Sequence, residues 1–172
     1  MHTHDGITGM VPVVVEQLDR AFYGDAWHGP SVMEALRGVD AAQAHDHPLH
    51  GAHGIWEIAL HLASWKHEVC RRVEGAEPHS PLEGDWPEPP AADADADAWR
   101  ASLDALDRAH RRLVAATKLL QPGRLHDMVG AHRDHPLGTG VTFAAMLLGS
   151  VQHDVYHAGQ IVLLRRAQNA ER

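Results

Sequence analysis

The sequence predicts an all-α fold: a four-helix bundle in which a long crossover joins the second helix to the third. Apolar residues recur at helical spacing in four long stretches, and no stretch of the sequence has the convincing alternation of a β-strand. Residues 76–97, between the second and third stretches, are rich in proline and acid. A proline-rich segment is semi-extended, so it has the reach to traverse the length of a bundle.

Each stretch begins and ends at residues that typically start or stop helices. The four helices are therefore expected near residues 10–23, 54–74, 97–120 and 143–167. Ser31 and Asp40 are expected to begin two short helical pieces between the first two long helices. Thr142 is expected to cap the last helix. The acidic run at residues 92–97 is expected to be solvated and to begin the third helix, where acidic groups oppose the helix dipole favourably. The whole chain, residues 1–172, is expected to form one domain.

The amino-acid composition indicates which kinds of binding partner to expect. The chain has 172 residues, 44% of them hydrophobic, and a formal net charge of −8. Lys66 and Lys118 are its two lysines, and no run of basic residues occurs, so nucleic-acid binding is not expected. No apolar run approaches the roughly 20 residues of a membrane span. The first residues, MHTHDGITGM, lack the basic flank and apolar core of a signal peptide, so neither a membrane nor export is expected.

Cys70 is the single cysteine, so no disulfide is possible within the chain. This cysteine usage fits a reducing compartment, and we expect a cytoplasmic protein. The residue lies in the middle of the second predicted helix. We expect it to be a small buried hydrophobic residue rather than a catalytic group.

Two histidines of the last predicted helix make the first candidate site. His153 and His157 are four residues apart, so their imidazoles point the same way from adjacent turns. They lie on a stripe of the helix that is apolar at both ends, so both side chains are expected to be buried. Burying two imidazoles without hydrogen-bond partners costs a few kcal/mol. A metal ion would satisfy both, with a third ligand from elsewhere in the chain. Two hydrogen-bonded core histidines explain the pair equally well at this stage.

The second predicted helix carries another histidine at the edge of its buried face. Its apolar stripe consists of Ile55, Ile58, Leu62, Trp65 and Val69. His61 lies roughly 80° from the centre of that stripe, a placement that fits a group facing a cavity at the rim of the bundle. His67 is expected in solvent, and His110 of the third helix at the edge of the core. The loop histidines at residues 45–53 and 126–135 are weaker alternatives, because a flexible loop does not preorganise a site.

Two segments of the chain resemble the DinB/YfiT superfamily. Residues 55–65, which contain H-L-x-x-W, and residues 153–161, which contain H-x-x-x-H-x-G-Q, carry the resemblance. It extends from about residue 10 to 167. It implies a four-helix bundle with one divalent metal ion on three histidines, which match His61, His153 and His157. Relatives include thiol S-transferases that use low-molecular-weight thiols, a mycothiol-dependent maleylpyruvate isomerase and proteins described as metal-dependent hydrolases, and they are often homodimers.

Two classes of function follow from that resemblance. The first is a metal-dependent enzyme acting on a small-molecule substrate, either a thiol S-transferase or a hydrolase, because three imidazoles leave open coordination positions on the metal. Glu57, one turn from His61, and Gln160, one turn from His157, are the candidate catalytic residues. Zinc or nickel is the expected metal, and iron and copper also suit imidazole ligands. The second class is a non-catalytic, metal-stabilised binding or stress-response bundle, which would have a sealed rather than an open site.

Overall fold

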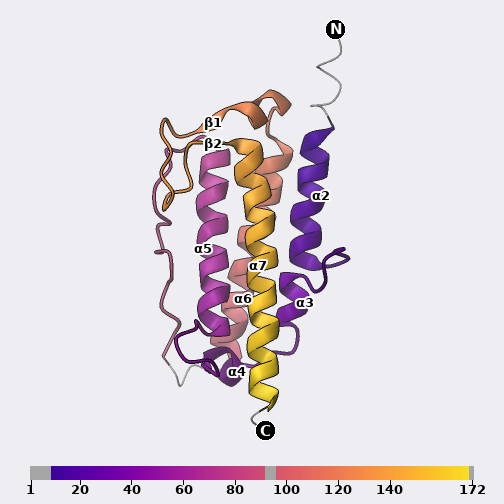
Figure 1. The fold of residues 1–172 in the computed structure, drawn as a ribbon, viewed down its shortest axis with the longest axis vertical. Helices are drawn as coiled ribbons and strands as arrows, with labels where there is room; N and C mark the ends of the chain where they lie inside the picture. Colours follow the sequence, from indigo (N-terminus) through magenta and orange to yellow (C-terminus); the bar gives the residue numbers. More distant parts are fainter. Residues whose placement is uncertain (1–8, 92–95, 171–172) are drawn as a thin grey trace.

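Four long helices run along the long axis of the molecule, as predicted (Figure 1). The computed structural model describes residues 9–91 and 96–170. The long helices are α2 (Met10–Tyr23), α5 (Ile55–Val73), α6 (Ala96–Lys118) and α7 (Phe143–Ala170). Helix α6 ends before the predicted residue 120, because Leu119 and Leu120 form tight turns instead. Helix α7 continues past residue 167, where the Gln168 side chain donates to the backbone oxygen of Gln43.

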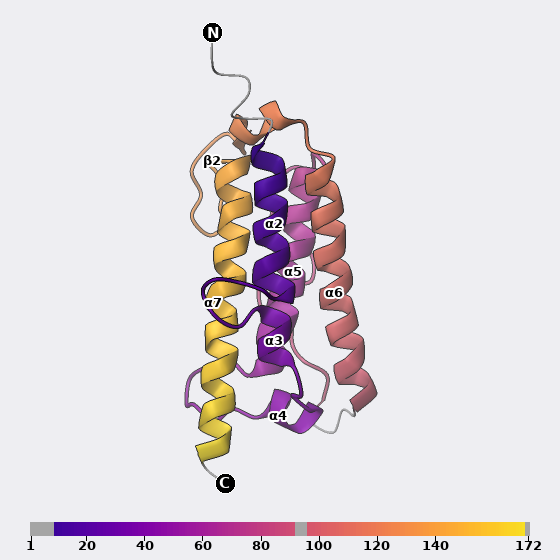
Figure 2. The ribbon, with the colours of Figure 1, turned by 90° about the vertical axis from the view of Figure 1, so that its right-hand side faces the viewer.

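The four helices pack as a closed ring. Contacts join α5 to α6, α6 to α2, α2 to α7 and α7 to α5. Helices α5 and α6 run in one direction, and α2 and α7 run in the other (Figures 1 and 2). Since α5 and α6 point the same way, the chain must return along the bundle before α6 begins. The segment after α5 makes this return beside α5, and the predicted crossover is confirmed.

The crossover changes the environment of α5. Helix α5 is buried on nearly all sides, and its buried residues include Trp56, Ala59, Ala63 and Cys70 in addition to most of the predicted stripe. Trp65, which the stripe placed in the core, is only half-buried, and its indole N–H donates to Asp85 of the crossover at 2.6 Å. The prediction was wrong for Trp65 because its side chain faces the irregular crossover rather than another long helix. Helices α6 and α7 and the crossover all pack against α5.

Short elements complete the bundle and confirm the predicted caps. Helices α3 (Val32–Leu36) and α4 (Ala41–His45) begin at Ser31 and Asp40, each of which forms a reciprocal capping box. Thr142 Oγ1 accepts from the backbone N–H of Ala145 in the first turn of α7. None of the helices in the described residues is long and apolar enough to cross a membrane.

A small hairpin joins α6 to α7. After a 3₁₀ turn, η1 (Pro122–His126), strand β1 (Met128–Val129) pairs antiparallel with β2 (Val141–Thr142). The loop between the strands, residues 130–140, folds down the outer side of α5 (Figure 1). Residues 1–8 and residues 92–95 of the predicted acidic run lie outside the described residues. Helix α6 begins within the acidic run, at Ala96, as predicted.

Candidate metal centre

A layer of buried polar side chains separates two hydrophobic clusters. One cluster contains Trp56 and Ile161, and the other contains Leu113 and Leu147. Helices α2, α5, α6 and α7 each contribute to both clusters. The polar layer between the two clusters consists of the buried residues His61, Lys66, His110, Asp154 and His157, together with the partly buried His153. Buried polar groups destabilise a fold unless they are paired, so each member of the polar layer needs a partner.

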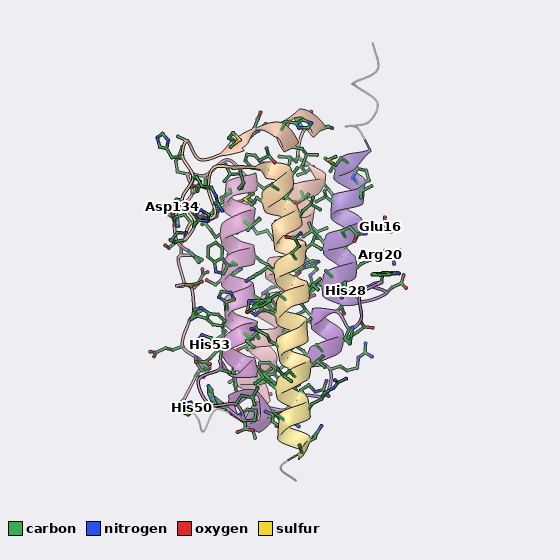
Figure 3. All side chains as sticks on the ribbon, in the orientation of Figure 1. Glu16, Arg20, His28, His50, His53 and Asp134 are labelled. Carbon is green, nitrogen blue, oxygen red and sulfur yellow. The ribbon has the colours of Figure 1, made fainter. Side chains whose placement is uncertain are left out.

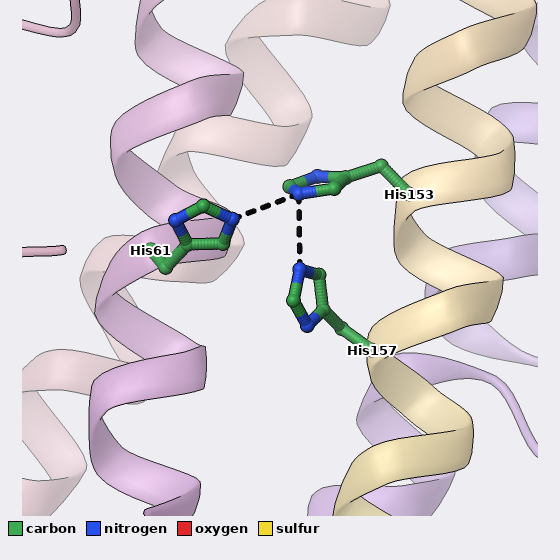
Figure 4. Close-up of side chains that lie close together, drawn as sticks. All are labelled: His61, His153 and His157. Atoms are coloured by element: carbon green, nitrogen blue, oxygen red, sulfur yellow. Dashed lines mark hydrogen bonds between the residues drawn. The ribbon is translucent and has the colours of Figure 1, made fainter. Parts of the chain in front are cut away.

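Three histidines of the polar layer converge on one point (Figure 4). His61 projects from α5 toward His153 and His157 of α7. The Nε2 atom of His153 lies 2.9 Å from that of His61 and 3.0 Å from that of His157. In the part of the chain that the structure describes, these form the one group of three histidine, cysteine or acidic side chains with metal-ligand spacing.

The hydrogen bonds of the other ring nitrogens decide where the protons lie. Nδ1 of His61 is 2.5 Å from the backbone oxygen of Asp85, and that oxygen only accepts. Nδ1 of His157 donates to Oε1 of Gln160 at 2.6 Å. Neutral His61 and His157 therefore present Nε2 lone pairs. His153 has at most one Nε2 proton, so at least one of the two close contacts joins two lone pairs.

A cation fits this arrangement. For metal–nitrogen bonds of about 2.0–2.1 Å, neighbouring ligands lie about 2.9–3.4 Å apart in common coordination geometries. The observed separations of 2.9 and 3.0 Å fall in that range. A divalent ion between the three Nε2 atoms would also satisfy the lone pairs that face one another. The two bonded Nδ1 atoms fix the ring orientation of His61 and His157, as in known metal sites.

Burial keeps the three imidazoles neutral. It lowers the pKa of His153 to about 3, with further lowering from the positive charge that His157, His61 and Lys66 would place nearby. It lowers the pKa of His157 to about 4, and His61 again adds to the effect. Burial also lowers the pKa of His61, despite the opposing contacts with Asp85. Metal ions bind neutral imidazole, so the site is in its ligating form near neutral pH.

Two cavities border the histidine cluster. The larger, of about 430 Å³, is lined by His61, His153 and the loop of residues 130–140. The smaller, of about 310 Å³, is lined by His157, Gln160 and Trp86. No residue lines both cavities. The cluster is therefore open on two sides rather than sealed in the core.

The two candidate catalytic residues have different surroundings. Gln160 contacts His157 directly, as described above. The Glu57 carboxylate accepts from the backbone N–H of Gly54 at 2.7 Å and lies within 3.2 Å of ring nitrogens of His47 and His53. It caps α5, and no contact joins it to His61 in the described residues. It lines neither cavity beside the cluster. Catalytic roles for both residues stay predictions.

The remaining histidines lie elsewhere. His67 is partly exposed and pairs with Glu83 at 2.9 Å. His110 is fully buried in the core rather than at its edge, where it stacks on Phe22. In the loops, Nδ1 of His135 accepts from Arg133 at 3.1 Å. Within the described residues these histidines form no second cluster with metal-ligand spacing.

Sequence reasoning missed the buried ion pair beside the cluster. Lys66 of α5 and Asp154 of α7 are 2% and 1% exposed, and their charged atoms are 2.6 Å apart. This pair joins the two helices that carry the histidines. The available signal was helical spacing: Leu62, Ala63, Val69 and Cys70, the residues three and four positions from Lys66, are all apolar, and Asp154 is directly beside His153. The contacts of Trp86 and Asp85 with His61 had no comparable signal, because both residues lie in an irregular segment.

The fold and the cluster define a class: helical bundles with an open three-histidine site that could hold a metal ion. The family model of the DinB superfamily matches residues 27–161, a range that includes all three histidines. The chain belongs to the DinB superfamily. No curated protein and no solved structure matches the chain significantly.

Proposed function

We propose that this chain is a metal-dependent enzyme that transfers a low-molecular-weight thiol to an electrophile. One observation carries the proposal: the histidine cluster lies between two cavities that share no lining residue. A two-substrate reaction needs a place for each substrate beside the reacting centre. The cavity volumes of about 430 and 310 Å³ fall in the usual range for small-molecule sites, on the order of 300–1,000 Å³.

The proposed reaction depends on a metal ion held by the three histidines. His61, His153 and His157 would hold one divalent ion, with zinc or nickel proposed first and iron as the alternative. When bound, such an ion lowers the pKa of a thiol or a water molecule, so that the anion is available near neutral pH. In the transfer, sulfur forms a bond to the electrophilic carbon, the thiol proton passes to solvent, and the leaving group departs with its electron pair.

The open cluster favours an enzyme over a metal-stabilised bundle without turnover. Closed sites are typical of structural metals, whereas three protein ligands with an accessible face are typical of catalytic ones. His61 and His153 line the larger cavity and His157 lines the smaller. Hydrolysis of one substrate would need only one of these cavities, so transfer explains more of the geometry.

A metal assay followed by a thiol panel tests the proposal. Metal per chain is measured by plasma mass spectrometry on untagged protein, and zinc- or nickel-loaded protein is then mixed with different thiols and a chlorodinitrobenzene. We expect the wild type and His67→Ala to form the thiol-dependent product faster than the uncatalysed reaction, and His153→Ala to show only the uncatalysed rate. Turnover of an ester without thiol would favour the hydrolase instead. Absence of both activities would contradict an enzyme.

A further inference from the structure

The loop of residues 130–140 is a fixed wall of the larger cavity. Its Leu137 oxygen accepts from the buried Arg72 of α5 at 2.8 Å, and Thr139 donates to the His132 oxygen at 2.7 Å. Gly140 has a positive φ of 68°, and a Cβ there would lie 2.5 Å from Cα of Arg133. Only glycine permits this close approach. The loop therefore holds Arg133 in place beside α5, on the side where Figure 3 labels the neighbouring Asp134.

Arg133 brings an unneutralised charge to this cavity. Its guanidinium donates to the backbone oxygens of Asp134 and Thr139 and to Nδ1 of His135. No carboxylate pairs with it among the described residues. The other arginine that lines the cavity, Arg72, is bound to Glu68 at 2.7 Å. Arg133 is therefore the cavity's available cationic group.

Among the described residues, one acidic side chain lines the larger cavity, and it lies next to the histidines. Asp85 Oδ1 accepts from the indole N–H of Trp65 at 2.6 Å and lies 3.4 Å from Nδ1 of His61. The negative charge of Asp85 would therefore partly neutralise a metal ion on the histidine cluster. It does not neutralise the Arg133 guanidinium on the loop. With a divalent ion in place, the cavity has a net positive charge. Such a cavity favours an anionic molecule.

Resting on the proposed thiol transfer, we propose that the thiol substrate carries a carboxylate and that Arg133 binds it. The sulfur of this substrate would face His61 and His153, and the carboxylate would face the guanidinium. Arginine presents paired N–H donors that match the two oxygens of a carboxylate. Arg133 would then select among thiols without contacting the reacting sulfur.

Two small thiols that differ in charge test the inference. Cobalt-loaded protein is titrated with mercaptopropionate or with mercaptoethanol, and binding is followed by the visible spectrum of the ion. We expect the wild type to prefer mercaptopropionate. Arg133→Gln should weaken mercaptopropionate binding about 5- to 10-fold and leave mercaptoethanol binding unchanged. Arg133→Lys should keep part of the preference, because the charge remains.

The matched control is Arg111→Gln, which removes the same charge from α6. Arg111 pairs with Asp107 at 2.5 Å and lines neither cavity, so both affinities should stay as in the wild type. Equal weakening of both thiols by Arg133→Gln would show that Arg133 only supports the loop, and would overturn the inference. So would equal affinities in the wild type. A spectrum that responds to neither thiol would overturn the thiol transfer itself.

Discussion

The indole ring of Trp86 lies flat on the imidazole of His61, with ring centroids 3.9 Å apart and planes inclined by 10°. His53 stacks on Trp86 as well, at 3.6 Å. The residue before Trp86, Asp85, supplies the backbone oxygen that accepts from Nδ1 of His61. Two consecutive residues of the crossover therefore fix the orientation of a histidine that belongs to α5. The crossover is part of the candidate metal centre as well as a connection.

Replacing Trp86 should weaken metal binding. Trp86→Leu removes the ring that holds His61 in place, and we expect metal affinity to fall about tenfold. A competition titration with a chromogenic chelator measures this. Trp27→Leu is the matched control, because Trp27 is fully exposed and should not affect the metal. Unchanged affinity in Trp86→Leu would mean that α5 alone orients His61.

Each histidine of the cluster should be required for stoichiometric metal. His61→Ala, His153→Ala and His157→Ala each leave two imidazoles, so we expect less than one metal ion per chain by plasma mass spectrometry. His67→Ala and His135→Ala should retain the metal, since those side chains bind Glu83 and Arg133 instead. One tightly held ion in the double variant His153→Ala, His157→Ala would place the site elsewhere, with the histidines at 45–53 as the first alternative.

Gln160 should act through His157. Gln160→Leu removes the acceptor of the Nδ1 proton, which frees the ring to rotate or to change tautomer. We expect metal affinity to fall about 10- to 100-fold. Gln160→Glu keeps an acceptor at the same place and should retain most of the affinity. Equal affinities for the two variants in the chelator titration would argue against this role.

Glu57 should matter for helix stability rather than for the metal. Burial alone would raise the pKa of Glu57, but hydrogen bonds from Gly54, His47 and His53 outweigh it and lower the pKa. Glu57→Ala should lower the free energy of unfolding by about 0.5–1 kcal/mol in urea, because the N-terminus of α5 loses its cap. Glu57→Gln keeps an acceptor and should lose less.

The same two variants decide the catalytic role predicted for Glu57. Both should keep one metal ion per chain, because the carboxylate contacts none of the three histidines. A loss of turnover in Glu57→Gln, with metal and stability retained, would support a role in catalysis. Full turnover would assign Glu57 to capping alone.

Features set by local sequence were the ones that could be predicted. The capping boxes at Ser31 and Asp40 depend on residues within one turn, and the shared face of His153 and His157 follows from their spacing. Helical spacing placed His61 only at the edge of the apolar stripe of the second predicted helix. Its assignment as the third ligand came from the resemblance, since no local pattern says which helices become neighbours.

Features made by irregular segments could not be predicted. The crossover and the loop of residues 130–140 have no periodic pattern, so the sequence does not show which helix they cover. The contacts of Asp85, Trp86 and Arg133 depend on that placement. The apolar stripe likewise assigned α5 one buried face, and it could not show which residue of α7 would pair with Lys66.

The buried His110 should make the metal-free protein less stable as the pH falls. His110 is fully buried, and its Nε2 donates to Asp19 at 3.1 Å. Burial, with a smaller contribution from Lys66, lowers the pKa of His110 to about 2. An unfolded histidine has a pKa of about 6.5, so between these values the unfolded chain binds more protons. The free energy of unfolding therefore falls below pH 6.5, by up to about 1.4 kcal/mol per pH unit from this residue.

Urea unfolding in the presence of a chelator, at pH 7 and pH 5, isolates this contribution. His110→Gln removes the titrating group. The amount by which its free energy of unfolding lies below that of the wild type should therefore be about 2 kcal/mol smaller at pH 5 than at pH 7. Leu106→Ala also disturbs the core next to α5 but adds or removes no titrating group, and its deficit should be the same at both pH values. A deficit of His110→Gln that does not change with pH would show that His110 is protonated in the folded protein as readily as in the unfolded chain.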